Sequence, residues 1–290
     1  MAGSNREFIG RTQPVREYVL NPEIVAAYVD ATGDNNARYA GEGAVAPPVS
    51  VVIGTIPHSI YPLLDQEEFI RDRKRFLKLL HGEEDIRWFH PIKPTDTFRM
   101  TTTVADLVDK SIGELMSLET EVRNGDEIHL ATVNTQLIIR ESKPAEERIK
   151  STRSLKTDPT STAEEAGEPI VSSWTVEPDQ SIRYAKASGD DNPIHLDDET
   201  AKRAGLKGKI LHGLCTMAFA GRTIVDRVLD GDPTHLKRLK VRFSKPVFMG
   251  DTLTCTLQPV AIGGHYRVSV QNQDGIVVLR DGVAEVDPSP

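Results

Sequence analysis

The residues best suited to chemistry lie in one short segment, SGDDNPIH, which runs from Ser188 to His195. Asp190 and His195 stand five residues apart in it. Asn192 and Pro193 between them predict a turn, because proline fixes φ and asparagine hydrogen-bonds to its own backbone. Such a turn can bring a carboxylate and an imidazole to one small molecule. Alternatively, Asp190 caps the next helix and His195 is incidental, and the spacing alone favours neither interpretation.

A second feature is the segment ILHGL, which places Gly213 at the start of an apolar run that extends to about Leu229. A run that is apolar on every side is typical of a helix enclosed by other structure. The first N–H groups of such a helix have no partner within it, and the helix dipole is positive there. The Gly213 amide is therefore a candidate to stabilise negative charge on a carbonyl oxygen. His212 either lines the same pocket or packs against the helix.

An acid/base pair beside an oxyanion site is the equipment for reactions at the carbons α and β to a thioester carbonyl. No motif in the sequence indicates a cofactor. GEGAVA at Gly41 follows no strand, and GLKGKI at Gly205 lacks the spacing of a phosphate loop. The remaining histidines have no zinc-ligand spacing; they are His58, His81, His90, His129, His235 and His265. The sequence predicts no metal site and no cofactor.

Composition excludes several classes of partner. The net charge of −8 and the pI near 5.6 argue against nucleic acid, which needs a basic surface. The most apolar stretch, 46–64, contains four prolines and is a poor membrane span. The N-terminal residues do not resemble a secretory signal, and the only two cysteines form no pair motif. A soluble protein of the cytoplasm is expected.

The chain repeats itself. YVLNPEIVAAYVDATGDNNARY, from Tyr18, matches WTVEPDQSIRYAKASGDDNPIH, from Trp174, at an offset of 156 residues without gaps. RWFHPIKPTDTF, from Arg87, matches RFSKPVFMGDTL, from Arg242, at an offset of 155. Two blocks in the same order and almost the same register indicate two copies of one fold. The segment between the copies is polar and lacks either hydrophobic period, as linkers do.

The second copy predicts an α+β unit. Short helices are expected over 178–188 and 197–205, followed by the enclosed helix over 213–229 and then by four strand-like runs. A buried helix followed by antiparallel strands suggests a sheet wrapped around one helix. We therefore expect an N-terminal half over 1–140, a linker over 141–170 and a C-terminal half over 171–290, with the halves packed side by side.

The run Y-A-x-x-S-G-D-x-N-P-I-H, followed by A-x-x-A-G-L-x-G-x-I-L-H-G-L, resembles the signature of (R)-specific enoyl-CoA hydratases in the MaoC-like group. The resemblance implies a double hot-dog fold, in which each unit is an antiparallel sheet around a long central helix. It also implies site residues, which are Asp190 and His195 as the catalytic pair, Gly213 as the amide that holds the thioester oxygen, and Asn192, His212 and Tyr184 in supporting positions.

The first half departs from this signature. Asp34 and Asn36 remain, but Ala37 stands in place of Pro193 and Tyr39 in place of His195. The segment APPV replaces LHGL, and proline has no backbone N–H to donate. A phenol is also a poor substitute for an imidazole at neutral pH. We expect this half to be inactive, to shape the tunnel for the acyl chain, and to use its aspartate as a turn residue.

The expected reaction is the reversible hydration of trans-2-enoyl-CoA to (3R)-hydroxyacyl-CoA, with an acyl-CoA as the one small-molecule partner. The nearest alternative is a (3R)-hydroxyacyl-carrier-protein dehydratase of fatty-acid or polyketide synthesis. A non-catalytic acyl-CoA-binding protein and a thioesterase are further alternatives on the same fold. Neither nucleic acid nor a membrane is an expected partner, and a homodimer of double hot-dog units is expected.

Overall fold

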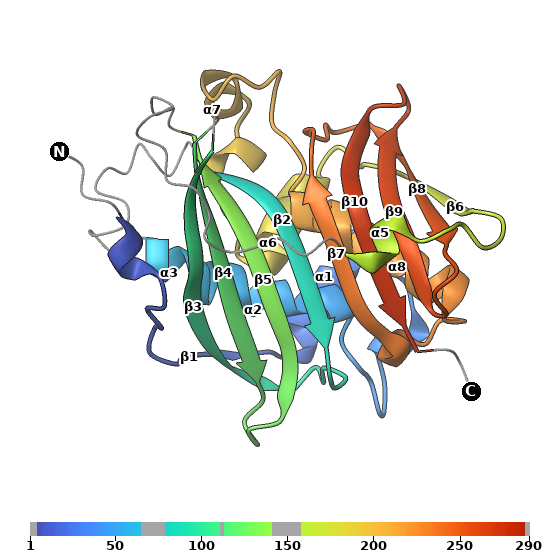
Figure 1. The fold of residues 1–290 in the computed structure, drawn as a ribbon, viewed down its shortest axis with the longest axis horizontal. Helices are drawn as coiled ribbons and strands as arrows, with labels where there is room; N and C mark the ends of the chain where they lie inside the picture. The colour runs from blue at the N-terminus through green and yellow to red at the C-terminus, as the bar shows by residue number, and fades with distance from the viewer. Residues whose placement is uncertain (1–4, 65–78, 111–112, 141–157, 288–290) are drawn as a thin grey trace.

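The computed structural model describes residues 5–64, 79–110, 113–140 and 158–287. Its strands form one continuous sheet that curves around the helices on its inner face (Figure 1). All neighbouring strands in the sheet are antiparallel. The α+β class predicted from the sequence is confirmed.

Each half contributes five strands. Those of the first half are β1 (Arg16–Val19), β2 (Leu79–Trp88), β3 (Thr97–Lys110), β4 (Gly113–Arg123) and β5 (His129–Ile139). Those of the second half are β6 (Ile170–Thr175), β7 (Leu236–Phe243), β8 (Thr252–Pro259), β9 (His265–Asn272) and β10 (Val277–Val286). Their order is β1-β3-β4-β5-β2-β7-β10-β9-β8-β6. This order is symmetric about its centre, so each strand lies as far from one edge of the sheet as its repeat counterpart lies from the other. The halves therefore meet where β2 pairs with β7.

An ion cluster lies on this junction. Arg238 of β7 donates to both carboxylate oxygens of Asp85 on β2 at 2.7 Å, and also to Asp158 and Glu285 at 2.7 Å. Only 9% of the Arg238 side chain is exposed, so solvent screens these contacts less than it screens ordinary surface pairs. One guanidinium thus joins the two halves and the segment that precedes β6.

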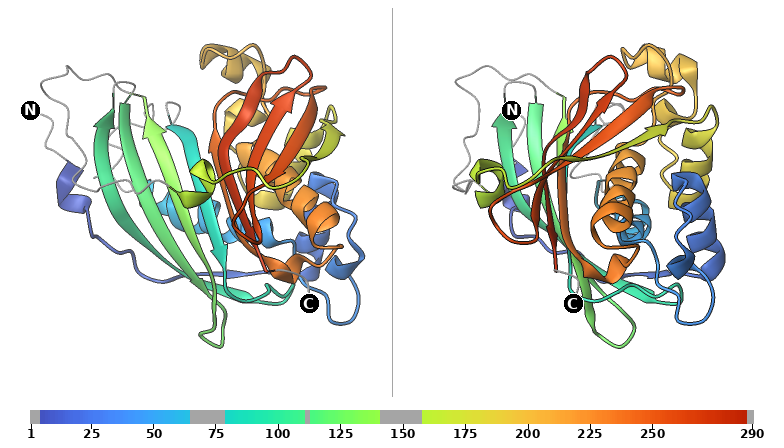
Figure 2. Two further views of the ribbon diagram at one scale, coloured as in Figure 1. Left: turned by 45° about the vertical axis from the view of Figure 1, so that its right-hand side comes forward. Right: turned by 90° about the vertical axis from the view of Figure 1, so that its right-hand side faces the viewer.

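All helices but α5 lie on the inner side of the sheet, whereas α5 packs on its outer face against β9 and β10 (Figure 2). The helices are α1 (Pro22–Thr32), α2 (Val52–Thr55), α3 (Tyr61–Leu64), α5 (Pro159–Thr162), α6 (Gln180–Ser188), α7 (Asp198–Arg203) and α8 (Gly213–Val228). The central helix α8 is buried along most of its length, as its all-round apolar sequence predicts. Among the described residues, no helix is long and apolar enough to cross a membrane.

The central helix of the first half differs from the expected long helix. It is a series of short pieces over 48–64: a 3₁₀ turn, α2, a π turn over Ile56–Ile60, and α3. Pro57 has no N–H to continue the α-helical ladder, and the Tyr61 N–H donates instead to Ile56 O, five residues back. The prolines therefore break this helix and rotate the residues that follow it.

Part of the predicted linker over 141–170 lies outside the described residues, namely 141–157. The part that is described contains the short helix α5, and β6 begins at Ile170. The Asp158 side chain accepts the Thr160 N–H and so caps α5. This segment is therefore attached to the body of the protein, since the same aspartate contacts Arg238.

Candidate active site

A cavity of about 720 Å³ lies between the two halves. The second half contributes the side chains of Asp190, Asn192, His195 and His212 and the backbone of Gly213, and the first half adds polar side chains of its own, among them Tyr61 and His81. Its apolar lining comes from both halves and includes Ile56, Ile60, Leu79, Leu137, Leu214, Phe243 and Leu279. A mostly apolar cavity with a few convergent polar groups is the usual form of a small-molecule site. The predicted catalytic residues therefore share one cavity.

The loop between α6 and α7 holds Asp190 and His195. Gly189 ends α6 in the left-handed conformation, with φ 74°, which glycine adopts without strain. The Asn192 side chain accepts the Ile194 N–H at 3.4 Å and its carbonyl accepts the His195 N–H at 3.0 Å. These bonds form the turn that the Asn-Pro pair predicts, and they bring the imidazole back toward Asp190.

Backbone carbonyls fix both imidazoles of the site. His195 Nδ1 donates to Ile210 O at 2.9 Å, and His212 Nε2 donates to Asp190 O at 2.9 Å. In the neutral tautomers that these bonds select, His195 Nε2 and His212 Nδ1 are acceptors. The two rings stack with centroids 3.8 Å apart. His212, for which the sequence left two roles open, both lines the cavity and precedes α8.

The pKa values of Asp190, His195 and His212 are all shifted from their usual values. Burial lowers the pKa of His195, an effect that Asp190 only partly offsets. Burial and the neighbouring His195 lower the pKa of His212 to about 3. Burial raises the pKa of Asp190, but the two imidazoles and the hydrogen bonds donated to the carboxylate outweigh it, so the pKa lies below its usual value. At neutral pH the site holds one carboxylate and two neutral imidazoles.

Sequence analysis missed Tyr61, which comes from the first half. Its phenol O–H donates to Asp190 Oδ1 at 2.7 Å. The same oxygen accepts the Asn192 N–H at 3.3 Å, so Oδ1 has two donors. Burial and the nearby carboxylate raise the pKa of Tyr61 well above its usual value, which keeps the O–H protonated. The tyrosine is therefore a donor that orients Asp190.

Gly213 is the first residue of α8, as predicted, and lines the cavity. A Cβ at this position would lie 2.8 Å from the ring of Phe243. Only glycine therefore fits here without moving that ring. Because the N–H groups of the first helical turn have no intrahelical partner, the Gly213 amide can donate to a ligand oxygen.

Tyr184 lies behind the site. Its fully buried ring packs at 4.9 Å from the ring of His212 and at 5.7 Å from the ring of Tyr28 on α1. Tyr184 does not line the cavity. It contacts the imidazole of His212, which does line the cavity, and supports that ring by packing.

Asp190, His195 and His212 are also the one group in the described part of the chain with donors placed for a metal ion. Their donor atoms lie within 4.8 Å of one another. However, the two imidazole rings are stacked, with 26° between their planes. Ligands of a zinc ion instead converge on one point about 2.0 Å from each nitrogen. The absence of a metal site stays a prediction.

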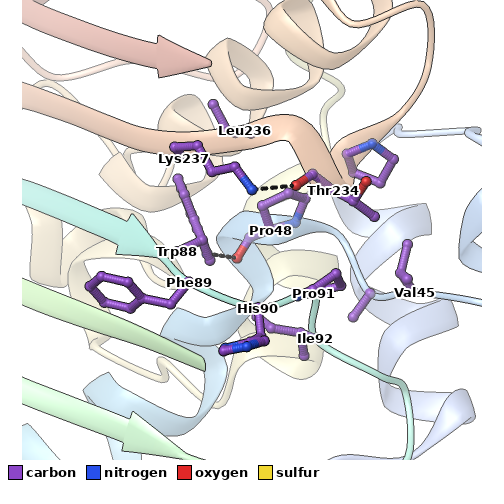
Figure 3. Close-up of a pocket in the computed structure, with 12 residues that line it drawn as sticks. Val45, Pro48, Trp88, Phe89, His90, Pro91, Ile92, Thr234, Leu236 and Lys237 are labelled. Atoms are coloured by element: carbon purple, nitrogen blue, oxygen red, sulfur yellow. Dashed lines mark hydrogen bonds between the residues drawn. The ribbon is translucent and has the colours of Figure 1, made fainter. Parts of the chain in front are cut away.

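The first half has a counterpart of this cavity that is nearly closed, with a volume of about 20 Å³ (Figure 3). Ala46 N donates to Ile92 O just as Leu211 N donates to Val247 O, so Pro48 stands where Gly213 stands. Trp88 Nε1 donates to Pro48 O at 3.0 Å and lies against this proline. The counterpart therefore lacks both the space and the amide.

The loop around Asp34 has the backbone geometry of the loop that holds Asp190 and His195, but it lacks the histidine. Asp34 Oδ1 accepts the Asn36 N–H at 3.4 Å, as Asp190 accepts that of Asn192. Tyr39, in place of the histidine, is buried. Burial, together with the negative charge of Asp226, raises the pKa of Asp34 to about 6. This loop has a carboxylate but no imidazole beside it.

Comparison with protein families gives one match for each half. The MaoC like domain matches residues 159–278, and the FAS1-like dehydratase domain region matches residues 7–133. Probable enoyl-CoA hydratase 2 of Dictyostelium discoideum is 30% identical over 73% of this chain and 71% of its own length. The 3-hydroxyacyl-thioester dehydratase Y of Mycobacterium tuberculosis is 32% identical over 71% and 72%. Peroxisomal multifunctional enzyme type 2 of mouse is 27% identical, and the match spans only 28% of it.

Solved structures show the same fold. The MaoC-like dehydratase of Phytophthora capsici superimposes with a TM-score of 0.81 over 99% of both chains, at 23% identity. A Mycobacterium tuberculosis protein described as having a double hotdog fold superimposes with a TM-score of 0.63 over 96% of both chains, at 15% identity. These likenesses confirm the double hot-dog fold predicted from the sequence.

Proposed function

The chain belongs to the MaoC-like family, and from this premise we propose that it is a hydro-lyase that adds water reversibly to trans-2-enoyl-CoA and forms (3R)-hydroxyacyl-CoA. The observation that supports this most directly is the convergence of the Asp190 carboxylate, the His195 imidazole and the Gly213 amide on one cavity. Relatives named as enoyl-CoA hydratases and 3-hydroxyacyl-thioester dehydratases agree with it.

In the proposed reaction a water molecule lies between Asp190 and His195. Tyr61 and the Asn192 amide occupy Oδ1, which leaves Oδ2 of the carboxylate to accept one water proton. His195 Nε2 accepts a hydrogen bond from the second O–H of the water, because Nδ1 is committed to Ile210 O, and this second proton stays on the oxygen as that of the product hydroxyl. The water oxygen then bonds to C3, and the C2=C3 electron pair moves toward the thioester oxygen. The Gly213 N–H stabilises that oxygen by about 3 kcal/mol, as other oxyanion donors do.

The tautomer of His195 decides how the proton reaches C2. In one division of the roles, Asp190 is the base and His195 is the proton donor. A neutral imidazole with its proton on Nδ1 has none on Nε2 to give. We therefore propose that the proton delivered to C2 is one that the pair has just taken from the water. The O–H bond that breaks supplies the C2–H bond that forms, and the site returns to its starting state.

Basic side chains at the cavity favour coenzyme A as the carrier of the acyl group. Arg140, Arg203 and Lys245 are exposed and contribute to its lining. Guanidinium and ammonium groups bind phosphate oxygens well, and coenzyme A brings a diphosphate and a 3′-phosphate. Charge reversal at Arg203 or Lys245 should raise KM for an enoyl-CoA more than it lowers kcat.

The same cations are the reason to keep a second candidate, a dehydratase of (3R)-hydroxyacyl groups on a carrier protein. Carrier proteins present a phosphate and acidic side chains, which suit the same basic surface. The two candidates differ in the thioester that they accept, which is a CoA ester for the first and an acyl-carrier protein for the second. Steady-state rates with crotonyl-CoA and with crotonyl-carrier protein separate them, since the proposed hydratase has the larger kcat/KM with the CoA ester.

The decisive experiment measures the loss of enoyl absorbance from crotonyl-CoA and analyses the product on a chiral phase. Wild-type protein should form the R product, and Asp190→Asn should form it more slowly by at least two orders of magnitude. Release of free thiol in place of hydration would identify a thioesterase. An S product would refute the stereochemical assignment and with it the roles given to the loop.

Two finer expectations remain proposals. A cytoplasmic location is one, and it competes with the peroxisome, which the name of the mouse relative specifies. A homodimer of double hot-dog units is the other, and a molar mass from light scattering would test it. Neither affects the reaction proposed above, because each chain contributes every residue of the site.

A further inference from the structure

A second pair of ionisable side chains lies beside the same cavity. His81 of β2 lines it, and His81 Nε2 donates to Glu84 Oε2 at 2.8 Å. The Glu84 side chain is fully buried, and its Oε1 has no hydrogen-bond partner among the described residues. The edge of the His81 ring packs on Phe243, whose own ring covers Gly213. One aromatic ring thus separates this pair from the oxyanion site.

A β-bulge places the two side chains together. Residues three apart in a regular strand point to opposite faces of the sheet. In β2 the register shifts between His81, opposite Leu137, and Glu83, opposite Gln136, so Gly82 is the extra residue. The bulge turns His81 to the face that carries Glu84, which is the face of the cavity.

The second half has no such pair. At the repeat offset of 155 residues, leucines Leu236 and Leu239 stand in the places of His81 and Glu84, and both are buried in the core. Packing therefore does not require polar residues here. A buried carboxylate costs free energy unless it is hydrogen-bonded, so a fold that needed only a core would favour leucine. The pair is a departure specific to the half that lacks the catalytic loop.

We propose that His81, held by Glu84, is a hydrogen-bonding subsite for the thioester substrate, a proposal that rests on the function proposed above. Glu84 accepts from Nε2, which leaves Nδ1 as the acceptor that the ring offers. The subsite therefore takes a donor group, an N–H or O–H. Two parts of a thioester supply one: an amide of the pantetheine arm, or a hydroxyl carried by the acyl chain.

The test compares His81→Leu, which installs the residue of the second half, with wild type on matched thioesters. The crotonyl thioesters of N-acetylcysteamine and of ethanethiol differ in one amide, which corresponds to the first amide of the pantetheine arm. The CoA esters of 2-hexenoic and 6-hydroxy-2-hexenoic acid differ in one hydroxyl. His129→Leu is the control, because His129 stacks on Phe89 and does not line the cavity. Glu84→Gln is the second variant, in which the ring stays but loses its carboxylate partner.

The expected result is a loss in kcat/KM that is about two- to tenfold larger, the usual effect of one neutral hydrogen bond, for the donor-bearing member of one pair than for its partner. A larger loss with the N-acetylcysteamine ester than with the ethanethiol ester assigns the pantetheine amide. Loss with the hydroxylated ester alone assigns the acyl chain. Equal losses for all four thioesters, or no loss for any, would overturn the subsite.

A binding measurement separates failure of this subsite from failure of the proposed reaction. The dissociation constants of the four thioesters are measured by calorimetry on Asp190→Asn protein, with and without His81→Leu. If wild-type protein hydrates none of the thioesters, the reaction is wrong, but a selective loss of affinity still supports the subsite. If wild-type protein hydrates them and affinity is unchanged, the subsite alone is wrong.

Discussion

Replacement of Tyr61 by phenylalanine removes one O–H group and leaves the ring that packs in the broken helix of the first half. In the wild type this O–H donates to Asp190 Oδ1 at 2.7 Å and helps to hold the pKa of that carboxyl below its usual value. The variant should therefore have a higher pKa at Asp190. In the proposed reaction the carboxylate accepts the proton of water, so activity should fall as pH falls through this pKa, and the acid limb of kcat/KM should move to higher pH.

The structure sets the size of this shift. A hydrogen bond to a charged group contributes about 1.5–3 kcal/mol, and one pKa unit corresponds to about 1.36 kcal/mol. The loss of the phenol alone would thus raise the pKa by about one to two units. The Asn192 N–H still donates to the same oxygen, so we expect the lower value. Above the acid limb, turnover should fall only a few-fold, because Oδ2 still faces the water.

The matched control is Tyr39→Phe. Tyr39 belongs to the corresponding loop of the first half and is buried, so its replacement also removes one phenol O–H from the protein. Its removal should leave the pH profile of hydration unchanged. If the acid limb of Tyr61→Phe coincided with that of the wild type while circular dichroism showed an intact fold, Tyr61 would not orient the base. A parallel shift in both variants would point to a general effect of lost tyrosines.

Further predictions concern the two loops and the oxyanion site. His195→Ala should lower kcat by about 10²–10⁴-fold with little change in melting temperature, since the loop adds little to the core; retention of a tenth of the activity would contradict its role. Gly213→Ala should displace the Phe243 ring and lower kcat more than it raises KM, which steady-state kinetics will measure. Asp34→Asn should leave turnover unchanged. Burial raises the pKa of Asp34 from 3.8 to about 6. This shift lowers the free energy of unfolding of the wild type by about 3 kcal/mol at pH values above the folded pKa, and by nothing at pH values below 3.8. Denaturant titrations should therefore show the Asp34→Asn variant gaining stability relative to wild type as pH rises through this window. Treatment with a chelator should leave hydration unaffected, and a loss restored by zinc would reveal a metal in the site.

Local patterns in the sequence predicted the elements that hold the catalytic loop. The Asn-Pro turn, the acidic first turn of α7 and the all-round apolar α8 each report on interactions within a few residues. The repeat then predicted that a second unit exists, since shared blocks imply a shared fold. These features follow from short-range hydrogen bonds and from periodicity, which a single sequence carries directly.

Contacts across the two halves could not be predicted in the same way. Tyr61 lies 129 residues from Asp190, within an apolar stretch whose prolines indicated only a poor membrane span. Its direction depends on the π turn that follows Pro57. His81 was considered a lone strand histidine, because the bulge at Gly82 that turns it toward Glu84 has no signature beyond one glycine. Side-chain direction after an irregular turn or bulge is set by tertiary packing.

Pro48 and Gly213 occupy matching places in the two halves. Tyr61 follows Pro48 by the same number of residues as Asp226 follows Gly213, so these two residues also correspond. In an assembly of two identical chains every substitution is made twice, so a proline at this place would remove the amide from both sites. A single chain that contains both halves escapes this constraint. One half can give up its own chemistry, and its helix becomes free to supply a donor to the other. The asymmetry of the active site is thus available only where the two units differ in sequence, as the two halves of this chain do.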